Sequence, residues 1–328
     1  MGELEMTRGE PVAEDRKEAH TERIVDGVWT PGGLAEFSGV SFGATTKGLE
    51  RRLPGIGYTP RLRVTADAKR AIDDRADLEL ALQHSNSPFT VDEFRGRKVS
   101  AGLQLTRALK QLDPEADPHD MVKTRLVHGT DVVVIDEDYV RRSKEELVNV
   151  IADGLVTNLK HRPLLVAAAD CAPIMVYDPA GQAIGIFHAG RRGTEEGLAT
   201  RGVQTMMREY GSRLENLRVV VGPSIDKESY SVDREFYDRM SMKVDQNGEP
   251  YYTAEELEEI FAPDPTDLNA VQFDNGKAIV IEMTKLGVPL ENIEVSQYST
   301  YKDNEHFSSE RKEGFANRDT IMAMAVLK

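Results

Sequence analysis

The sequence predicts a mixed α and β fold, and three observations lead to this prediction. Short runs rich in Val, Ile and Leu recur along the chain between turn residues, as is typical of strands that are buried on both faces. Segments with helical spacing of apolar residues lie between these runs. We see no internal repeat and no linker within residues 23–328, so we expect one domain in which helices and strands alternate.

The first hundred residues are mostly polar. Residues 1–22 are highly charged and poor in apolar residues, so we expect a disordered tail. Residues 43–48 form a small-residue loop that has room to approach a ligand through Lys47, although an ordinary connector is the simpler interpretation. Apolar spacing predicts helices over residues 66–82 and 100–112.

The next segments alternate between strands and helices. Strands are expected at residues 121–127 and 131–135, with His128 and Gly129 in the turn between them. Ser143, with Glu146 three residues later, has the capping-box pattern that begins a helix.

The most apolar stretch of the chain is residues 164–187. It reads as three buried strands, at residues 164–169, 172–177 and 183–187. Cys171, the only cysteine, follows the first of these strands, and His188 follows the third. A thiol and an imidazole at the ends of buried strands are held in place by a rigid scaffold. We therefore expect the reactive groups of the protein here.

The last third of the chain has fewer strong signals. Residues 240–265 are acidic and turn-rich, and we expect a peripheral insertion there with a helical patch at residues 255–261. The other expected elements are a helix from residue 194 to about residue 210, a strand at 217–221, a helix at 267–286, and strands at 293–296 and 321–327.

Composition excludes several classes of function. The net charge of −15 argues against binding to nucleic-acid phosphates, which requires Lys and Arg. One cysteine cannot form an internal disulfide, so a reducing cytoplasm is the expected compartment. No run approaches the roughly 20 apolar residues of a membrane span, and the N-terminus has no apolar secretory signal.

His128, Cys171 and His188 share one setting, because each follows a predicted strand. Two imidazoles and one thiolate can hold zinc with the fourth position open for water, and zinc-bound water ionises near neutral pH. Their spacing matches no local metal motif. Taken singly, the cysteine reads as a small buried hydrophobe and each histidine as a structural residue.

The loop after His188 is a candidate anion site. Gly190 and Gly193 bracket two arginines directly before a predicted helix, so Arg192 and backbone N–H groups can meet an anion there. The alternative is an ordinary N-cap at Thr194 with solvated arginines. The two glutamates that follow suit a helix N-terminus and oppose anion binding.

Several segments together resemble the YfiH-type, laccase-domain family. They are VHGTDVVVID, DGLVTN, AADCAPIMVYDPAGQAIGIFHAGRRGT, VVGPSID, FSSERKEG and RDTIMAMAVL, in this order over nearly all of the chain after about Val40. The resemblance implies a single four-layer α-β-β-α sandwich and a zinc ion held by His128, Cys171 and His188. The chain departs from the family at Leu126, where glutamine is usual, and at Arg191, where tryptophan is usual.

The resemblance also implies a function. Family members phosphorolyse adenosine, inosine and guanosine, some act on methylthioadenosine, and adenosine is also deaminated. We therefore expect a zinc-dependent purine nucleoside phosphorylase with adenosine deaminase activity. Arg192 and Lys47 are expected to bind its phosphate.

Three other functions stay open. One is a copper-dependent polyphenol oxidase, although seven histidines are few for several copper centres. Another is a metal-free cysteine hydrolase, with Cys171 as nucleophile and His188 or His128 as base, that edits peptidoglycan precursors. The last is a binding protein with an inactive site. Metal content separates the phosphorylase, the polyphenol oxidase and the cysteine hydrolase, which would contain zinc, copper and no metal respectively.

Overall fold

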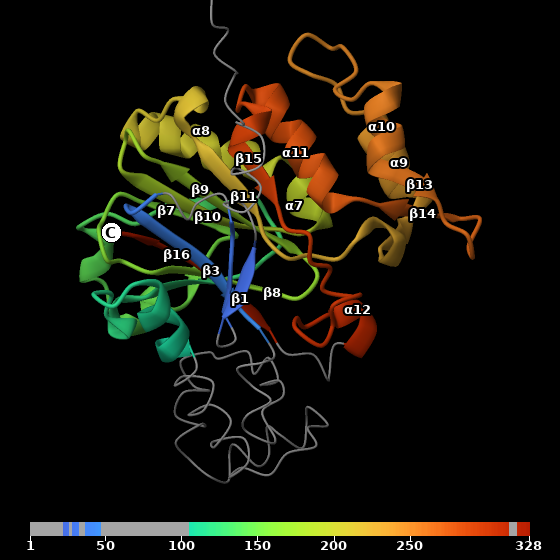
Figure 1. Cartoon of the computed structure of the whole chain (residues 1–328). Helices are drawn as coiled ribbons and strands as arrows, with labels where there is room; N and C mark the ends of the chain where they lie inside the picture. Colours follow the sequence, from blue (N-terminus) through green and yellow to red (C-terminus); the bar gives the residue numbers. More distant parts are fainter. Residues whose placement is uncertain (1–21, 26–27, 33–36, 47–104, 315–319) are drawn as a thin grey trace, which may run out of the picture.

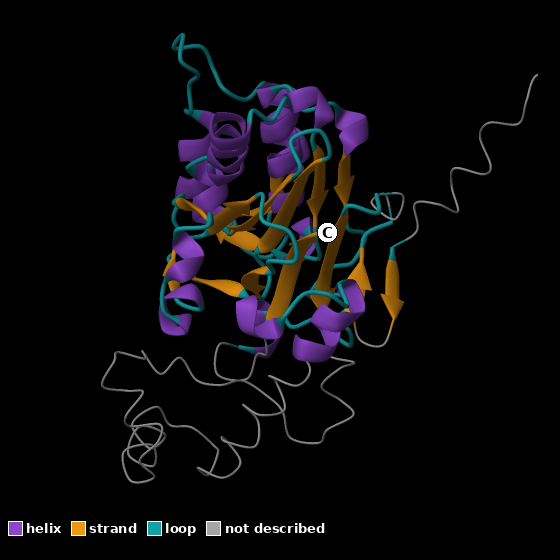
Figure 2. Cartoon of the chain, turned by 90° about the vertical axis from the view of Figure 1, so that its left-hand side faces the viewer, coloured by secondary structure: helices purple, strands orange, loops and turns teal. Residues whose placement is uncertain are grey.

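Two β-sheets form the centre of the molecule, with helices above and below them in the view of Figure 2. The computed structural model describes residues 22–25, 28–32, 37–46, 105–314 and 320–328. Lys47, the predicted helix at residues 66–82 and nearly all of the predicted tail lie outside these residues. The predicted mixed α and β fold is confirmed.

The seven-stranded sheet has the chain's last strand near its middle. Its order is β1 (Arg23–Val25), β2 (Val28–Thr30), β3 (Val40–Thr45), β16 (Ile321–Leu327), β8 (Leu164–Ala168), β4 (Val122–Arg125) and β6 (Val150–Ile151). Strand β16 pairs antiparallel with both β3 and β8. Residues 43–45, which we expected in a loop, belong to β3, because they pair with the neighbouring strands β16 and β2.

The six-stranded sheet contains the apolar centre of the sequence. Its order is β15 (Ile293–Val295), β11 (Arg218–Val221), β9 (Ala172–Asp178), β10 (Ala183–Ala189), β7 (Gly154–Thr157) and β5 (Val132–Val134). Every residue of β9 and β10 is buried, as expected for strands covered on both faces.

Alternation along the strands divides their side chains between two cores. In β10, Ile184 and Ile186 lie in the core between the two sheets, whereas Phe187 lies in the core beneath the helices. In β16, Ala325 faces the core between the sheets, and Met324 packs on the opposite side against the helix of residues 105–112. Each central sheet therefore has an apolar layer on both faces.

Helices α8 (Leu198–Tyr210) and α11 (Asn275–Leu286) cover the outer face of the six-stranded sheet (Figure 1). The shorter elements are η1 (Pro118–Asp120), η2 (Tyr139–Arg141), α6 (Lys144–Leu147), α7 (Arg191–Glu195), η3 (Leu214–Asn216), η4 (Lys227–Ser229), η5 (Leu290–Asn292) and α12 (Glu310–Glu313). The capping box of Ser143 and Glu146 at α6 is confirmed. Across the part of the chain that the structure covers, no helix has the length and apolar character of a membrane span.

Two predicted helices differ from the observed ones. The helix expected from residue 194 is two helices, α7 and α8, which are separated at Gly197 because this residue adopts a left-handed φ of 81°. The helix expected from residue 267 begins at Asn275, where the Asp274 side chain caps it by accepting a hydrogen bond from Lys277 N at 2.8 Å.

The residues before Asn275 belong to a small folded unit, which we call the insertion unit and which comprises residues 230–273. Strands β12 (Ser231–Asp233), β14 (Ala270–Phe273) and β13 (Phe261–Pro263) form a three-stranded antiparallel sheet with α9 (Arg234–Ser241) and α10 (Ala254–Ile260). Its aromatic core includes Phe236 and Phe273, with ring centroids 4.9 Å apart. Residues of the acidic segment 240–265 belong to the same core, which also includes Ala278 of α11. The acidic segment is therefore part of a packed unit.

Three glycines surround the ring of Phe187, directly before His188. A methyl group added to Gly154 would lie 2.8 Å from Phe187 Cδ1, and one added to Gly185 would lie 2.6 Å from Cζ. A methyl group on Gly202 of α8 would overlap Cζ. Helix α8 therefore approaches β10 as closely as it does only because residue 202 has no side chain.

We predict that Gly202→Ala lowers the free energy of unfolding by about 1–3 kcal/mol, the usual cost of overpacking a core. Alanine is the better helix former, so propensity alone predicts the opposite sign. Denaturant unfolding followed by circular dichroism measures the change.

Gly276→Ala in α11 is the matched control. Its added methyl group would lie 3.5 Å from Asp274 Oδ1 and 3.7 Å from Val295 Cγ1, which are ordinary contacts. This variant should be unchanged or stabilised by up to about 1 kcal/mol. Equal stabilities for the two variants would show that the Phe187 ring yields without cost.

Candidate metal centre

The pairing of β9 with β10 brings Cys171 and His188 to the same edge of the six-stranded sheet. The two strands are antiparallel, with His188 opposite Pro173 and Ala189 opposite Ala172. Cys171 directly precedes β9, so its thiol lies beside the end of β10.

His128 reaches this edge through a crossover between the sheets. The chain leaves β4 in the seven-stranded sheet and enters β5 in the six-stranded sheet. In the six-stranded sheet, Gly154 of β7 pairs with both Val132 of β5 and Phe187 of β10. The crossover that contains His128 therefore ends next to His188.

The three predicted ligands form one cluster. One ligand atom from each of His128, Cys171 and His188 lies within 4.8 Å of the other two. The two imidazole rings have centroids 5.0 Å apart and planes at 82°. A methyl group on Gly190 would lie 2.9 Å from Cys171 Sγ, so the loop can close over the cluster only with glycine at this position.

The cluster fits a tetrahedral metal ion. Zinc bonds of about 2.3 Å to sulfur and 2.0–2.1 Å to nitrogen place neighbouring ligand atoms roughly 3.5 Å apart, so a small inward movement of the side chains suffices. His188 is 2% exposed and His128 is exposed, so the site is closed at His188 and open at His128. The same His₂Cys donor set also suits copper.

Asp153 orders two of the three candidate ligands. Its Oδ1 accepts hydrogen bonds from His188 Nδ1 and from His128 N, both at 3.0 Å. Its Oδ2 accepts from Val127 N at 3.1 Å and Gly129 N at 2.8 Å. Because Asp153 holds the Nδ1 atom of His188, the Nε2 atom is left for a metal.

Charge in the cluster favours a thiolate. Burial alone would raise the pKa of Cys171, but the charge of His188 and hydrogen bonds from both histidines lower it to about 6. Burial would lower the pKa of His188, but the Cys171 thiolate and Asp153 raise it to about 9. The thiol is thus deprotonated at neutral pH, which is the form that binds metal.

The backbone is left-handed at two places in this cluster. His128 has a φ of 57°, and Asp170, directly before Cys171, has a φ of 84°. The Asp170 carboxylate accepts hydrogen bonds from Thr300 Oγ1 and Arg311 N, both at 2.7 Å. Such backbone conformations cost energy in residues other than glycine and occur often at functional sites, where surrounding contacts maintain them.

The residues of the predicted anion loop lie in different surroundings. Gly190 lies against Cys171, and Gly193 is buried near the carbonyl oxygen of Gly129. The Arg192 side chain is 66% exposed, and its Nε lies 2.7 Å from Glu196 Oε1.

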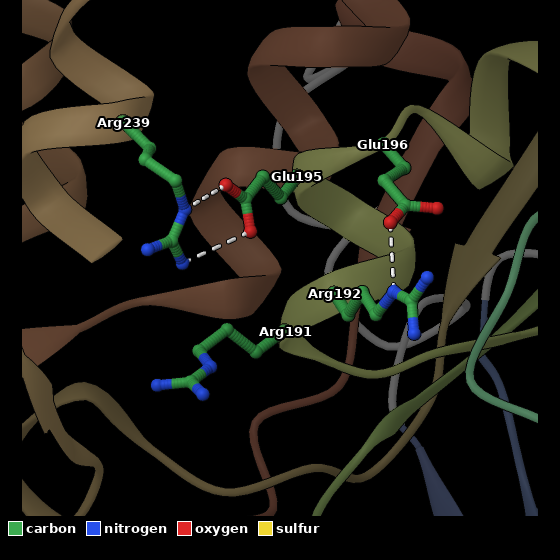
Figure 3. Close-up of a pocket in the computed structure, with 5 residues that line it drawn as sticks. All are labelled: Arg191, Arg192, Glu195, Glu196 and Arg239. Carbon is green, nitrogen blue, oxygen red and sulfur yellow. Dashed lines mark hydrogen bonds and ion pairs between the residues drawn. The ribbon is translucent and has the colours of Figure 1, made fainter. Parts of the chain in front are cut away.

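A shallow pocket of about 350 Å³ lies on α7. It is lined by Arg191, Arg192, Glu195, Glu196 and Arg239. Figure 3 shows the Arg191 and Arg192 side chains pointing to different sides of α7, while Arg239 is bound to Glu195. The pocket is therefore lined by ion pairs rather than by free cations.

The sequence-based prediction missed Asp153 and Asp170. Buried carboxylates are rare unless they are paired, and Asp153 directly precedes a buried run, which is a usable signal. Its partners, however, lie 24 to 35 residues away along the chain. Local sequence patterns do not identify such partners.

We predict that Asp153→Asn weakens zinc binding by roughly 10- to 100-fold, as is usual when a hydrogen-bond partner of a metal ligand is lost. The aspartate has two acceptor oxygens for its four donors, whereas asparagine has one acceptor oxygen and an NH₂ group that cannot accept. Competition with a chromophoric chelator measures the affinity. Asp131→Asn, at an exposed position of the same crossover, is the control and should bind zinc normally.

Comparison with known proteins identifies relatives of the chain. A purine nucleoside phosphorylase of Bacteroides thetaiotaomicron is 24% identical over 254 residues, which is 74% of this chain and 84% of that protein. Adenosine deaminase RL5, from an unknown prokaryotic organism, is 30% identical over 247 residues, which is 71% of this chain and 90% of that protein.

Solved structures share the fold. The crystal structure of the hypothetical protein YfiH of Bacillus licheniformis matches with a TM-score of 0.66 at 21% identity, covering 94% of this chain and 99% of that one. The family model described as multi-copper polyphenol oxidoreductase laccase matches residues 97–327, well over half of the chain. The chain therefore belongs to this laccase-domain family, of which YfiH is a structural representative.

Proposed function

We propose that the chain is a zinc-dependent purine nucleoside phosphorylase that accepts adenosine, inosine, guanosine and methylthioadenosine and also deaminates adenosine. The observation that supports this most is the convergence of His128, Cys171 and His188 within 4.8 Å. Relatives named purine nucleoside phosphorylase and adenosine deaminase lead to the same enzyme class.

The chain's own residues suit this chemistry. A bound zinc ion would supply a Lewis acid and an activated water. His128, Cys171 and His188 would hold the ion, and Asp153 keeps the His188 ring in one orientation. The exposed His128 side admits substrate.

The two reactions differ in the attacking group. In phosphorolysis a phosphate oxygen bonds to ribose C1′ while the C1′–N9 bond breaks, and the base leaves with the bonding electron pair. In deamination water adds to C6 of adenine and ammonia leaves. Phosphorolysis alone needs cations for the phosphate, and we assign this role to the loop of Gly190, Arg192 and Gly193.

A cysteine hydrolase is the second candidate, because one observation favours it. Cys171, His188 and Asp153 form a chain of hydrogen-bonded groups in which the thiol has a pKa of about 6. This is the arrangement of a nucleophile, a base and an orienting carboxylate. Copper oxidation has less support, because one ligand cluster is found among the residues that the structure describes.

One assay tests the reaction class. Metal-replete protein is incubated with a panel of purine nucleosides, with and without phosphate, and free base and ammonia are measured. Release of base only with phosphate supports phosphorolysis. Full activity after complete removal of metal would favour the hydrolase.

We predict that Cys171→Ser and His128→Ala lose bound zinc and at least 100-fold in activity while remaining folded, because serine is a poor zinc ligand and His128 is exposed. Elemental analysis and circular dichroism measure zinc content and folding. His119→Ala changes an exposed histidine in η1 and should behave as wild type. Normal zinc content and activity in Cys171→Ser would remove the thiolate from the mechanism.

We predict that Arg192→Ala raises KM for phosphate about tenfold, close to the contribution of one charge-assisted hydrogen bond. Arg192 must exchange Glu196 for phosphate, which reduces the effect below that of an unpaired arginine. KM for the nucleoside and the rate of deamination should hardly change. The control is Arg201→Ala at an exposed position of α8, and an unchanged KM for phosphate in Arg192→Ala would leave α7 with a structural role only.

A further inference from the structure

Tyr230 directly precedes β12, whose first residue, Ser231, is bound by Arg311, a residue that also contacts the neighbour of Cys171. Its ring lies between two neighbours, with Phe273 at 5.8 Å between centroids and the Arg311 guanidinium carbon 5.5 Å from the ring centroid. The ring thus contacts Phe273 and Arg311, and the hydroxyl is the part of the side chain left for a ligand. Among the described residues, this hydroxyl has no hydrogen-bond partner.

Two anchors fix Tyr230 and Arg311 next to Cys171. Arg311 N donates to Asp170, the residue directly before Cys171, and Arg311 Nη2 donates to Ser231 O at 3.0 Å. On the other side, Arg191 follows the glycine that touches Cys171 Sγ, and its Nη1 lies 2.6 Å from Asp233 Oδ2. The residues directly after Tyr230 are therefore tied, at Ser231 and Asp233, to Arg311 and Arg191, which contact or follow residues next to Cys171.

Electrostatics agree with this placement. Burial raises the pKa of Tyr230 to about 12; the charge of Cys171 adds to the rise, whereas Arg191 and Arg311 oppose it. The phenol is thus protonated at neutral pH and is available as a hydrogen-bond donor.

Arg311 differs from the other arginines near this edge. Those arginines form the ion pairs Arg191–Asp233, Arg192–Glu196 and Arg239–Glu195. Arg311 has no carboxylate within ion-pair distance in the described part of the chain, and only one of its nitrogens is engaged, with a neutral carbonyl oxygen. Arg311 is exposed, so its remaining donors are open to solvent.

We propose that Tyr230 and Arg311 form an oxyanion-binding wall of the metal centre and that the oxyanion is inorganic phosphate. The choice of phosphate rests on the proposed function. The wall would add donors from Tyr230 and Arg311 to those of the loop of Gly190, Arg192 and Gly193, to which we assign the same phosphate. An unpaired guanidinium and a neutral O–H donor are the groups that bind phosphate oxygens with direction. The insertion and the C-terminal segment would then complete the substrate site.

The experiment measures phosphate binding without turnover. Inorganic phosphate is titrated into cobalt(II)-loaded protein while the visible absorption of the metal is followed, and KM for phosphate is measured separately on the zinc enzyme. Arg311→Gln removes the charge and keeps a polar side chain, and Tyr230→Phe removes only the hydroxyl and keeps the ring packing. We expect phosphate affinity to fall at least tenfold in Arg311→Gln and at least threefold in Tyr230→Phe, with normal metal content. Arg311→Lys should recover part of the loss.

The chain offers a matched control in the same unit. Arg234 lies over the ring of Tyr237 at 4.9 Å, and Tyr237 packs on Phe261 in the core of the insertion. Arg234→Gln and Tyr237→Phe should bind phosphate as wild type does.

The outcomes separate this proposal from the proposed function. If nucleosides are cleaved with phosphate but Arg311→Gln and Tyr230→Phe keep wild-type affinity and KM, the wall is wrong and the function stands. If no nucleoside is cleaved but both variants bind phosphate weakly, the function is wrong and the wall stands. If wild type binds no phosphate, or if the control variants lose as much affinity, the wall is wrong.

Discussion

The buried carboxylate of Asp153 is the interaction on which the rest of the site depends. One side chain receives three backbone N–H groups of the crossover and the imidazole of His188. A carboxylate is costly to bury unless its oxygens are satisfied by donors. Here its four hydrogen bonds tie the crossover between the sheets to the ends of β7 and β10. Ligand geometry and sheet arrangement are thus fixed by the same group.

The parts of the site that come late in the sequence are joined to this centre by buried polar contacts. Thr194 donates to Asn275 Oδ1 at 2.7 Å, and Asn275 Nδ2 donates to Ala189 O at 2.8 Å. These bonds link α7, the start of α11 and the end of β10. Because α11 also shares a core with the unit of β12, β13 and β14, this unit is packed against the same helix that Asn275 links to β10.

Much of this arrangement could be predicted from the sequence, for physical reasons. Strands such as β9 and β10 are buried on both faces, so they leave continuous apolar runs that are visible without a structure. The candidate ligands were found because they stand at the ends of such runs and match a family pattern. Whether they hold a metal stays a prediction, although the fold brings them together.

The missed features depend on partners far away in the chain. The break at Gly197 and the strand β14 before α11 run against local helical spacing, because tertiary packing decides them. The role of Asp153 depends on donors at residues 127–129 and 188, and that of Asp170 on Thr300 and Arg311. Such contacts follow from strand order and register, which short sequence patterns do not specify.

Trp29 gives the molecule a built-in optical reporter. It is the only tryptophan, it is fully buried in β2, and its Nε1 donates to Glu22 Oε2 at 2.7 Å. The same carboxylate accepts from Ser296 Oγ at 2.8 Å and from Gln297 N at 2.6 Å, directly after β15. Tryptophan fluorescence therefore comes from one indole in β2 of the seven-stranded sheet. Through Glu22 this indole is linked to the residues that follow β15, an edge strand of the six-stranded sheet. The emission wavelength of the indole therefore reports whether the contacts that link Trp29 through Glu22 to Ser296 and Gln297 are intact.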